Sequence, residues 1–473
     1  MSTPLIGPGA LTATQHETGP DLPRSTRRML AHVHDPGLPD VDALAAQALF
    51  AHARSDAAHP EAFPELARRE AELVGFALDL VEAPEDAAGT VTGSGSESAL
   101  LAVLAAREAR PNVRHPTMVL PDTAHPSFLR AAQLLGVEPV VVPTDAAHRA
   151  QVGPMAHALD ERTVLAVVSA PSAAHGVIDP VAWIGTAATA KRVPLHVDAG
   201  AGGWLLALGE RLGRIIAPWT FTVAGVTTIS LDLHTDAYVP RGASVLLFRD
   251  AATRRLTGFG SADGPGRPAL TTTTGFSRPG GPVAAAARVV SGIGPDGYLH
   301  LAAQTLGAVE ALVAGVPSVP GLSLAHEPDA SLLLLRVDGD ADVFTVAAEL
   351  RSRGWYAECQ PSWRGEPATL RLTVSAGTRA HVDELLDALR ESVAAAEVTG
   401  AVRLPGRVVD HLRRLDPDHL EVYDVRTLLE TLGIDPLGAT VPLLDALVDA
   451  APSRLRAALV ARLADLRTAP VRG

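Results

Sequence analysis

The chain has 473 residues, of which 47% are hydrophobic, and a mean hydropathy of +0.17; these values exclude a disordered chain and indicate a large domain with one or two smaller ones. Its formal net charge of −13 argues against nucleic acid or an anionic membrane as the main partner. The single cysteine, Cys359, excludes an intrachain disulfide framework and fits a reducing compartment.

The N-terminal region predicts an arm followed by two helices. Residues 1–40 are rich in Pro, Gly and Thr, and they lack both the basic start and the long apolar core of a signal peptide. No stretch of the sequence reaches the roughly 20 apolar residues that span a bilayer, so we expect no membrane span and a cytoplasmic location. Helices are expected from Val41 to Arg54 and over residues 58–81, where leucines recur at helical spacing.

A turn of small residues comes next and precedes a strongly helical stretch. Residues 92–98 read TGSGSES and run directly into the helix expected from Ala99 to Arg110. Small residues let the backbone turn tightly, and the hydroxyl groups and free amides at a helix start favour an anion. Taken alone, the same pattern is usually only a helix cap.

Four short strands follow, and two of them lead into polar residues. His125 follows the first strand at the start of a helix that ends at Leu135, and Asp198 ends the fourth strand. An aspartate at the end of a strand can pair with a ligand or cap the next turn. The expected strands are Thr117–Leu120, Val140–Val142, Val164–Ser169 and Pro194–Val197.

A strand, a polar elbow and a second strand make up the stretch from Val226 to Arg249. The first strand is expected from Val226 to Leu233, His234 follows it directly, and the second strand is expected from Ala243 to Phe248. Such an elbow presents side chains at the rim of a sheet.

The remainder predicts a smaller α+β unit and a helical end. The expected elements are helices over Ala284–Val313, Val343–Arg353 and His381–Val398, strands over Leu332–Val337 and Leu370–Val374, and three or four short helices over Val402–Arg467. We therefore divide the chain into an arm and helix (1–57), a large domain (58–300), a small C-terminal domain (301–398) and an added helical segment (399–473).

Several of these segments resemble the pyridoxal-phosphate-dependent decarboxylase family, most closely its sphingosine-phosphate-lyase branch. Residues 92–98 resemble the family's T-S-G-G-T-E-S, with Gly95 and Ser96 in the places of its Gly-Thr pair, and residues 196–199 match its H-V-D-A. The elbow fits S-x-D-x-H-K-Y-G-Y-x-P-K-G-x-S, and residues 277–280 fit the end of G-S-R-x-G. The resemblance covers about residues 58–395. It implies an α/β fold of type I, with a mixed, mostly parallel sheet in an aminotransferase-like large domain.

The resemblance also implies a cofactor site for pyridoxal or pyridoxamine phosphate. By register, Gly95 and Ser96 hold the phosphate, His125 stacks on the ring and Asp198 pairs with the ring nitrogen. His234 belongs to the same site. In relatives the Ser277 and Arg278 loop reaches the neighbouring subunit's phosphate site, so a homodimer is implied.

The sequence departs from the family pattern at the position that matters most. Thr235 stands where the pattern has the lysine that holds the cofactor covalently, and Asp236 stands where it has a tyrosine, although Tyr238 is in register. Lys191 is the only lysine in the sequence, and it lies near the end of an expected helix, where cations are common surface residues. Because arginine cannot replace lysine as the linking amine, we expect noncovalent binding.

Three functions remain open on the sequence. The first is a lyase or decarboxylase relative that acts on a small amine or amino-acid substrate, with His234, Thr235, Asp236 and Tyr238 as candidate catalytic residues. The second is a catalytically silent paralogue that supports an active partner, and the third is a binding module for another ligand. Retention of the ring-handling residues argues against the third. Arg241 replaces a lysine that binds substrate phosphate in the lyase branch, and a surface arginine is the alternative.

Overall fold

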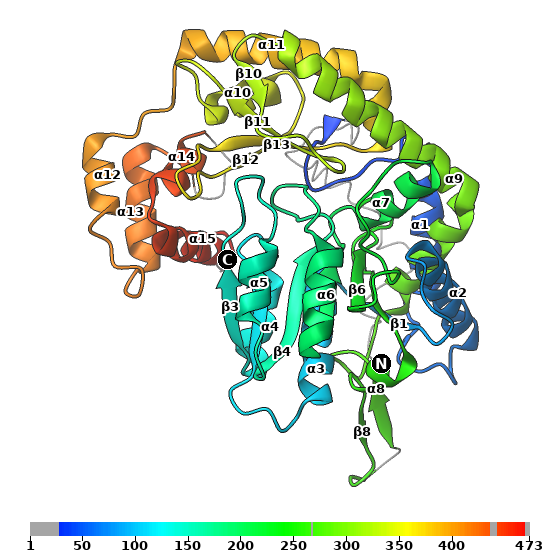
Figure 1. Ribbon diagram of the computed structural model, residues 1–473. Helices are drawn as coiled ribbons and strands as arrows, with labels where there is room; N and C mark the ends of the chain where they lie inside the picture. Colours follow the sequence, from blue (N-terminus) through cyan, green and yellow to red (C-terminus); the bar gives the residue numbers. More distant parts are fainter. Residues whose placement is uncertain (1–27, 266–267, 436–441, 469–473) are drawn as a thin grey trace, which may run out of the picture.

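A seven-stranded sheet forms the centre of the large domain, with strand order β1-β7-β6-β5-β4-β2-β3 (Figure 1). Within this sheet only β7 runs antiparallel to its neighbours, so the sheet is mixed and mostly parallel, as the sequence predicted. Its strands are Ala88–Thr92 (β1), Thr117–Pro121 (β2), Glu138–Val142 (β3), Thr163–Ser169 (β4), Leu195–Asp198 (β5), Val226–Asp232 (β6) and Ser244–Phe248 (β7).

The computed structural model describes residues 28–265, 268–435 and 442–468. Most of the arm expected over residues 1–40 therefore lies outside the described residues, as do two short parts of the added helical segment, 436–441 and 469–473.

Helices cover both faces of the large sheet. Side chains alternate between the faces along each strand: Met118 and Leu120 pack on one side, and Val119 on the other. The first face is covered by Gly95–Ala109 (α3) and Pro126–Leu135 (α4). The second face is covered by Pro64–Leu80 (α2), Val152–Ala158 (α5), Val181–Lys191 (α6), Gly203–Arg211 (α7) and Gly280–Gly315 (α9), with Pro39–Ala51 (α1) packed outside α9.

The long helix α9 joins the large domain to the small one. It was expected as one helix, but Gly294 has a φ of 66° and the next residue is Pro295, which cannot continue the hydrogen-bond ladder, so the helix is kinked there. By length and composition alone, Gly280–Ser318 also qualifies as a membrane span. Its buried side chains pack into the large core as far as Leu306 and into the small core from Ala308 onward, which is the pattern of a core helix.

The small domain is a four-stranded antiparallel sheet covered by two helices. The strand order is β10-β11-β13-β12. Its elements are Leu322–Leu324 (β10), Leu332–Val337 (β11), Val343–Ser352 (α10), Glu358–Gln360 (β12), Thr369–Thr373 (β13) and Val382–Thr399 (α11), with one-turn 3-10 helices over Val316–Ser318 (η2) and Ala376–His381 (η3). The expected α+β unit corresponds to this sheet and its helices.

Four helices follow the small domain and share a separate hydrophobic core. They are Gly406–Leu412 (α12), Val422–Leu432 (α13), Pro442–Ala450 (α14) and Ser453–Arg467 (α15). Helix α14 packs against α10, so this added segment rests on the small domain. The large domain also carries a short helix, Ala251–Arg255 (α8), and a hairpin of Phe259–Ser261 (β8) and Ala269–Thr271 (β9).

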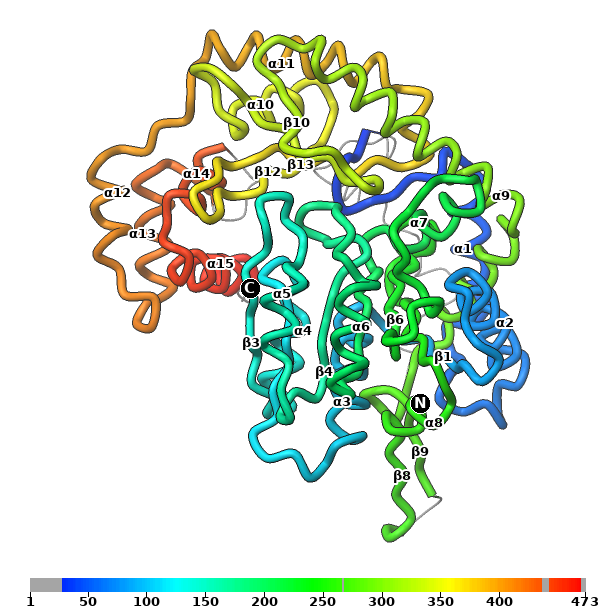
Figure 2. The backbone as a smooth tube through the Cα atoms, viewed as in Figure 1, coloured from blue at the N-terminus to red at the C-terminus, as the bar shows by residue number. Residues whose placement is uncertain are grey.

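The segment from Arg28 to Asp35 lies between the two domains, and Figure 2 shows it in dark blue between the small sheet and the large domain. The backbone N–H of Leu30 donates to Tyr356 O at 2.7 Å, and Leu30 O accepts from Thr373 N at 2.7 Å. The Leu30 side chain is buried in the small core. We call residues 28–35 the strap, because these contacts hold it across the opening described next.

Candidate active site

A cavity of about 340 Å³ opens between the carboxyl ends of β5 and β6, the start of α3, the strap and the small domain. This is the usual place for a ligand in an open α/β sheet. It brings together seven of the residues predicted from sequence: Gly95, Ser96, His125, Asp198, His234, Thr235 and Arg241. The other lining residues are His32, His34, Ser94, Ser127, Ala173, Gly200, Ala201, Asp232, Ser331, Leu332, Glu358, Arg371 and Thr373.

The start of α3 forms one end of the cavity. The Ser94 side chain caps the helix by accepting from the Glu97 amide at 3.3 Å, and Gly95 and Ser96 follow in the first turn. A side chain at position 95 would place its Cβ 2.5 Å from Asp232 Oδ1, so glycine is required there. The unpaired amides of this first turn can bind an anion such as a phosphate group.

Asp198 is a half-buried carboxylate that lines the cavity. It ends β5, and its Oδ1 accepts from Ser230 Oγ and from the Gly200 amide, each at 3.3 Å. Burial raises the pKa of Asp198, the charge of His125 opposes that effect and the negative charge of Asp232 adds to it. Such a carboxylate is well placed to pair with a cationic group of a ligand.

His125 both caps a helix and lines the cavity. Its Nδ1 accepts from the Ser127 amide at 3.2 Å, so it caps α4, and the same ring lines the cavity. Its Nδ1 also lies 2.8 Å from Ser127 Oγ. The two contacts fix the orientation of the imidazole beside Asp198.

The elbow after β6 carries no amine. The hydroxyl of Thr235 donates to Asp232 O at 2.8 Å and to Gly200 O at 3.2 Å, so it helps to hold the shape of the elbow. Lys191, the last residue of α6, is exposed and does not line the cavity. Next to Thr235, burial and the charge of Arg241 lower the pKa of His234, and Asp232 opposes them.

Two of the candidate catalytic residues lie behind the cavity wall. Asp236 is only 3% exposed, and burial raises its pKa to about 7. Tyr238 has a left-handed φ of 56°, and its hydroxyl lies 3.2 Å from Thr305 Oγ1 and accepts from the Ala376 amide at 3.2 Å. Tyr238 therefore ties the elbow to α9 and to the small domain.

Ser277 and Arg278 do not line the cavity of their own chain. Ser277 Oγ donates to Asp56 Oδ2 at 2.8 Å, and the Arg278 guanidinium forms an ion pair with Glu70 at 2.5 Å. Nearby, Glu97 in the first turn of α3 accepts from the Thr274 amide at 3.0 Å. The loop thus packs beside the start of α3, and its role at a partner's site stays a prediction.

Sequence reasoning missed the residues that reach the cavity from outside the large domain. His32 and His34 come from the strap, and Glu358 and Arg371 come from the small sheet. The alternating histidines of the strap were the only local signal. Arg241 Nη2 donates to His32 O at 3.0 Å, so the large domain also contacts the strap.

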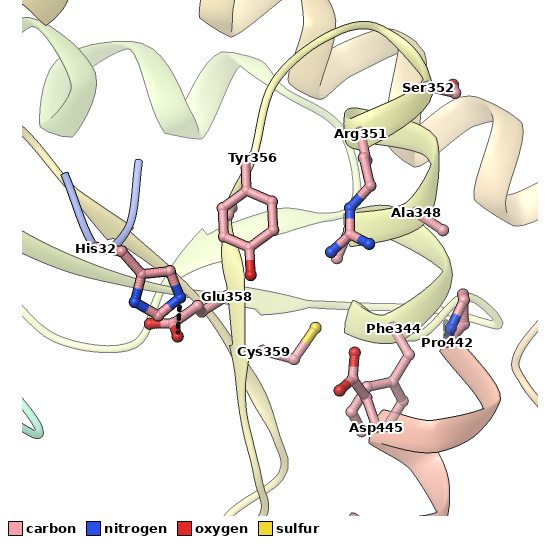
Figure 3. Close-up of a pocket in the computed structure, with 12 residues that line it drawn as sticks. His32, Phe344, Ala348, Arg351, Ser352, Tyr356, Glu358, Cys359, Pro442 and Asp445 are labelled. Atoms are coloured by element: carbon pink, nitrogen blue, oxygen red, sulfur yellow. Dashed lines mark ion pairs between the residues drawn. The ribbon is translucent and has the colours of Figure 1, made fainter. Parts of the chain in front are cut away.

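A second cavity of about 590 Å³ adjoins the first and shares His32 and Glu358 with it (Figure 3). The His32 Nε2–Glu358 Oε1 ion pair, at 3.0 Å, therefore belongs to a wall common to both cavities. Burial raises the pKa of Asp445 on the far side to about 6, against the effect of Arg351. Burial also raises the pKa of the Cys359 thiol, so it stays protonated at neutral pH.

The sequence of this chain is similar to those of known proteins. The model of the family described as the pyridoxal-dependent decarboxylase conserved domain matches residues 29–256. Sphingosine-1-phosphate lyase 1 from Rattus norvegicus is 32% identical over 322 residues, which are 67% of this chain and 56% of the rat protein. A probable L-tyrosine/L-aspartate decarboxylase from Methanothrix thermoacetophila is 33% identical over 66% of this chain and 78% of its own length.

Two solved structures superpose on the chain. A sphingosine-1-phosphate lyase from Burkholderia pseudomallei superposes with a TM-score of 0.73 at 30% identity, covering 79% of this chain and 87% of the other. Glutamate decarboxylase from Lactobacillus brevis gives a TM-score of 0.73 at 19% identity, covering 86% of this chain and 96% of the other, and shows the fold alone.

Proposed function

Since the chain belongs to the pyridoxal-dependent decarboxylase family, we propose that it binds pyridoxal or pyridoxamine phosphate without a covalent link and uses it for lyase or decarboxylase chemistry on a small amine or amino-acid substrate. The observation that carries the proposal is the meeting, in one cavity, of the first turn of α3 with the half-buried carboxylate of Asp198. Matches to both lyases and decarboxylases support this range of reactions.

The residues of the cavity fit the cofactor. Gly95 and Ser96 would hold its phosphate through backbone amides and a hydroxyl. Asp198 would pair with the protonated ring nitrogen, and the fixed imidazole of His125 would lie against the ring. When bound, the pyridine ring supplies an electron sink for the pair left behind when a bond to the substrate's α-carbon breaks. The 340 Å³ of the cavity lies within the range of small-ligand sites.

Other side chains bind and orient the substrate. Arg241 and Arg371 give the cavity a cationic end, which would attract a carboxylate or phosphate of the substrate. The strap and the small sheet would exclude water from the reacting atoms. His234, whose pKa is lowered, is neutral at physiological pH and can accept a proton from the substrate amine.

A catalytically silent paralogue is the second candidate, and the absence of an amine at Thr235 favours it. In relatives the lysine exchanges the cofactor with the substrate amine and often moves protons, so its loss removes two functions together. A silent protein would keep the fold and the cofactor-binding residues as a scaffold for an active partner. A homodimer that shares the site through Ser277 and Arg278 is part of the first proposal.

Turnover with a substrate panel separates the two candidates. Purified protein with pyridoxal phosphate is incubated with L-amino acids and with phosphorylated and plain amino alcohols, and proton NMR follows the products. We expect cofactor-dependent loss of one substrate, and loss of that turnover in Asp198→Ala. Saturable binding of pyridoxal phosphate without turnover of any compound would support the silent paralogue instead.

A further inference from the structure

Two buried polar side chains beside the cavity have no hydrogen-bond partner. Among the described residues, no residue other than Asp236 itself donates to its carboxylate oxygens, and none donates to or accepts from His34 Nδ1. The side chains are 10% and 2% exposed, and His34 Nδ1 lies 3.9 Å from Asp236 Oδ1. Burying such groups without partners costs stability, and costs of this kind are typical of functional sites.

The fold positions the two groups from separate parts of the chain. His34 belongs to the strap, which is held by the backbone pairing of Leu30 with the small domain. Asp236 lies in the elbow, one residue after Thr235 and on the side away from the cavity. Since Nδ1 faces Asp236, Nε2 is the nitrogen that His34 presents to the cavity it lines.

We propose that His34 is the acid–base catalyst of this site and that Asp236 acts through it as the second acceptor of the proton. The inference rests on the proposed function. In this chain Thr235 stands where relatives have the lysine that often moves protons, so another group must carry the proton. His34 is the catalytic residue, because it lines the cavity, and Asp236 is a positioning residue.

The proton transfer involves His34 and Asp236 in a single step. Once the bond from the α-carbon to the departing carbon has broken, the electron pair left on the α-carbon takes the proton on His34 Nε2 as Asp236 Oδ1 gives its proton to Nδ1, which leaves a neutral histidine and a carboxylate. Exchange of an α-hydrogen with solvent runs through the same atoms in reverse: the α-carbon proton binds Nε2 as the Nδ1 proton passes to Asp236 Oδ1.

The charged surroundings fit these roles. Burial, together with the positive charges of Arg241 and Arg371, lowers the pKa of His34 to about 3, so the imidazole is neutral and exchanges one ring proton for the other rather than forming an imidazolium. Burial raises the pKa of Asp236 to about 7, against the effect of its own backbone amide, so this carboxyl can exchange a proton near neutral pH. The 3.9 Å gap exceeds a direct hydrogen bond by about 1 Å, a distance that a small rotation of the imidazole closes.

The first test uses the cofactor-free protein and needs no activity. Protein with ¹³C-labelled histidine rings is titrated from pH 5 to 9, and the His34 signal is assigned from its loss in His34→Gln. We expect the wild-type signal to shift with a midpoint near 7, as Asp236 ionises beside it, and to lose that shift in Asp236→Asn. A His34 signal with the same titration in both proteins would overturn the pairing.

The second test measures the proton transfer itself. Protein loaded with pyridoxal phosphate is mixed in D₂O with the amino acids of the panel, and proton NMR follows exchange of the α-hydrogen. We expect His34→Gln to slow exchange by about 100-fold or more and Asp236→Asn by about tenfold. His157→Gln, an exposed histidine on α5, is the matched control and should exchange at the wild-type rate.

Cofactor binding measured on the same samples separates this inference from the proposed function. A wild-type protein that does not bind pyridoxal phosphate contradicts the proposed function, while the histidine titration still tests the pairing. Binding and exchange in wild type, with unchanged exchange rates in folded His34→Gln and Asp236→Asn, would overturn the inference alone.

Discussion

The two sides of the cavity differ in how their polar groups are satisfied. On the anchoring side, made of Gly95, Ser96, His125 and Asp198, the capping and carboxylate groups have hydrogen-bond partners within the large domain. On the reactive side, made of His34, Thr235 and Asp236, two of the three side chains are buried without partners. The anchoring side matches the family pattern, whereas the reactive side departs from it.

This contrast indicates which part of the chemistry the protein has changed. A chain that no longer used the cofactor would have no need for the half-buried carboxylate of Asp198, whose raised pKa shows that its charge is unfavourable there. Nor would it need a buried carboxylate at Asp236 beside a neutral histidine. We therefore interpret the reactive side as altered for a different proton transfer and the anchoring side as retained.

The largest expected effect comes from restoring an amine to the reactive side. Thr235→Lys should form a covalent, borohydride-reducible link to pyridoxal phosphate, because the new side chain starts in the cavity beside His234. Peptide mass mapping should find the pyridoxyl group at position 235 in this variant and at no peptide in wild type. Thr235→Met, of similar length without an amine, is the control. A modified Lys191 that tracked with activity in wild type would refute the noncovalent account.

The second effect concerns the anchoring side. Asp198→Ala removes a charge-assisted hydrogen bond, which is worth about 1.5–3 kcal/mol. Because tenfold in affinity takes about 1.4 kcal/mol, pyridoxal phosphate binding should weaken by roughly 10- to 100-fold. Ser96→Ala loses one of several hydrogen bonds to the phosphate, whose backbone-amide donors remain, and should have a smaller effect. Fluorescence titration measures both, and equal affinities for wild type and Asp198→Ala would show that the carboxylate has no part in binding.

A third prediction concerns how the stability of the folded protein depends on pH. The folded-state pKa of Asp236 is raised to about 7, so its burial lowers stability progressively as pH rises from about 4 to 7. Asp236→Asn removes this pH-dependent loss of stability. The variant's melting temperature should exceed that of wild type by a margin that grows over this window to a few degrees and then stays constant.

The reference for that stability measurement is Asp340→Asn, at an exposed aspartate of the loop before α10. Its melting temperature should equal that of wild type at every pH. A lower melting temperature for Asp236→Asn at pH 8 would mean that the carboxylate has stabilising partners, which contradicts the account of the reactive side.

The smallest expected effect tests whether the anchoring side is complete within one chain. If the Ser277 and Arg278 loop reaches a partner's phosphate site, light scattering should give a dimer at micromolar concentration, with an interface of roughly 2,000 Å² or more. Ser277→Ala should weaken cofactor binding only about two- to tenfold. A monomer that binds pyridoxal phosphate tightly would confine the site to one chain.

The anchoring side could be predicted from the sequence because its signals are local. The small-residue turn at 92–98 and the aspartate after a buried strand each occupy one short stretch, and parallel strands bring their carboxyl ends together. The strand β1 was missed because Ala88–Thr92 is short and contains Gly89. The kink of α9 was missed because the apolar pattern continues through Gly294 and Pro295.

The reactive side could be predicted only in part. Thr235 and Asp236 were found by register, but that pattern could not tell that Asp236 faces away from the cavity. His34 enters the site through long-range contacts, since Leu30 pairs with Tyr356 and Thr373 more than 300 residues away. The sequence of the strap has no hydrophobic pattern that indicates such a pairing.

One measurement tests the central claim most directly. Wild-type protein is dialysed to equilibrium against pyridoxal phosphate. A portion is then reduced with borohydride, and its intact mass is measured by mass spectrometry under denaturing conditions. The account predicts saturable binding of one cofactor per chain together with an unmodified protein mass. No saturable binding, or a mass increased by one pyridoxyl group, would contradict it.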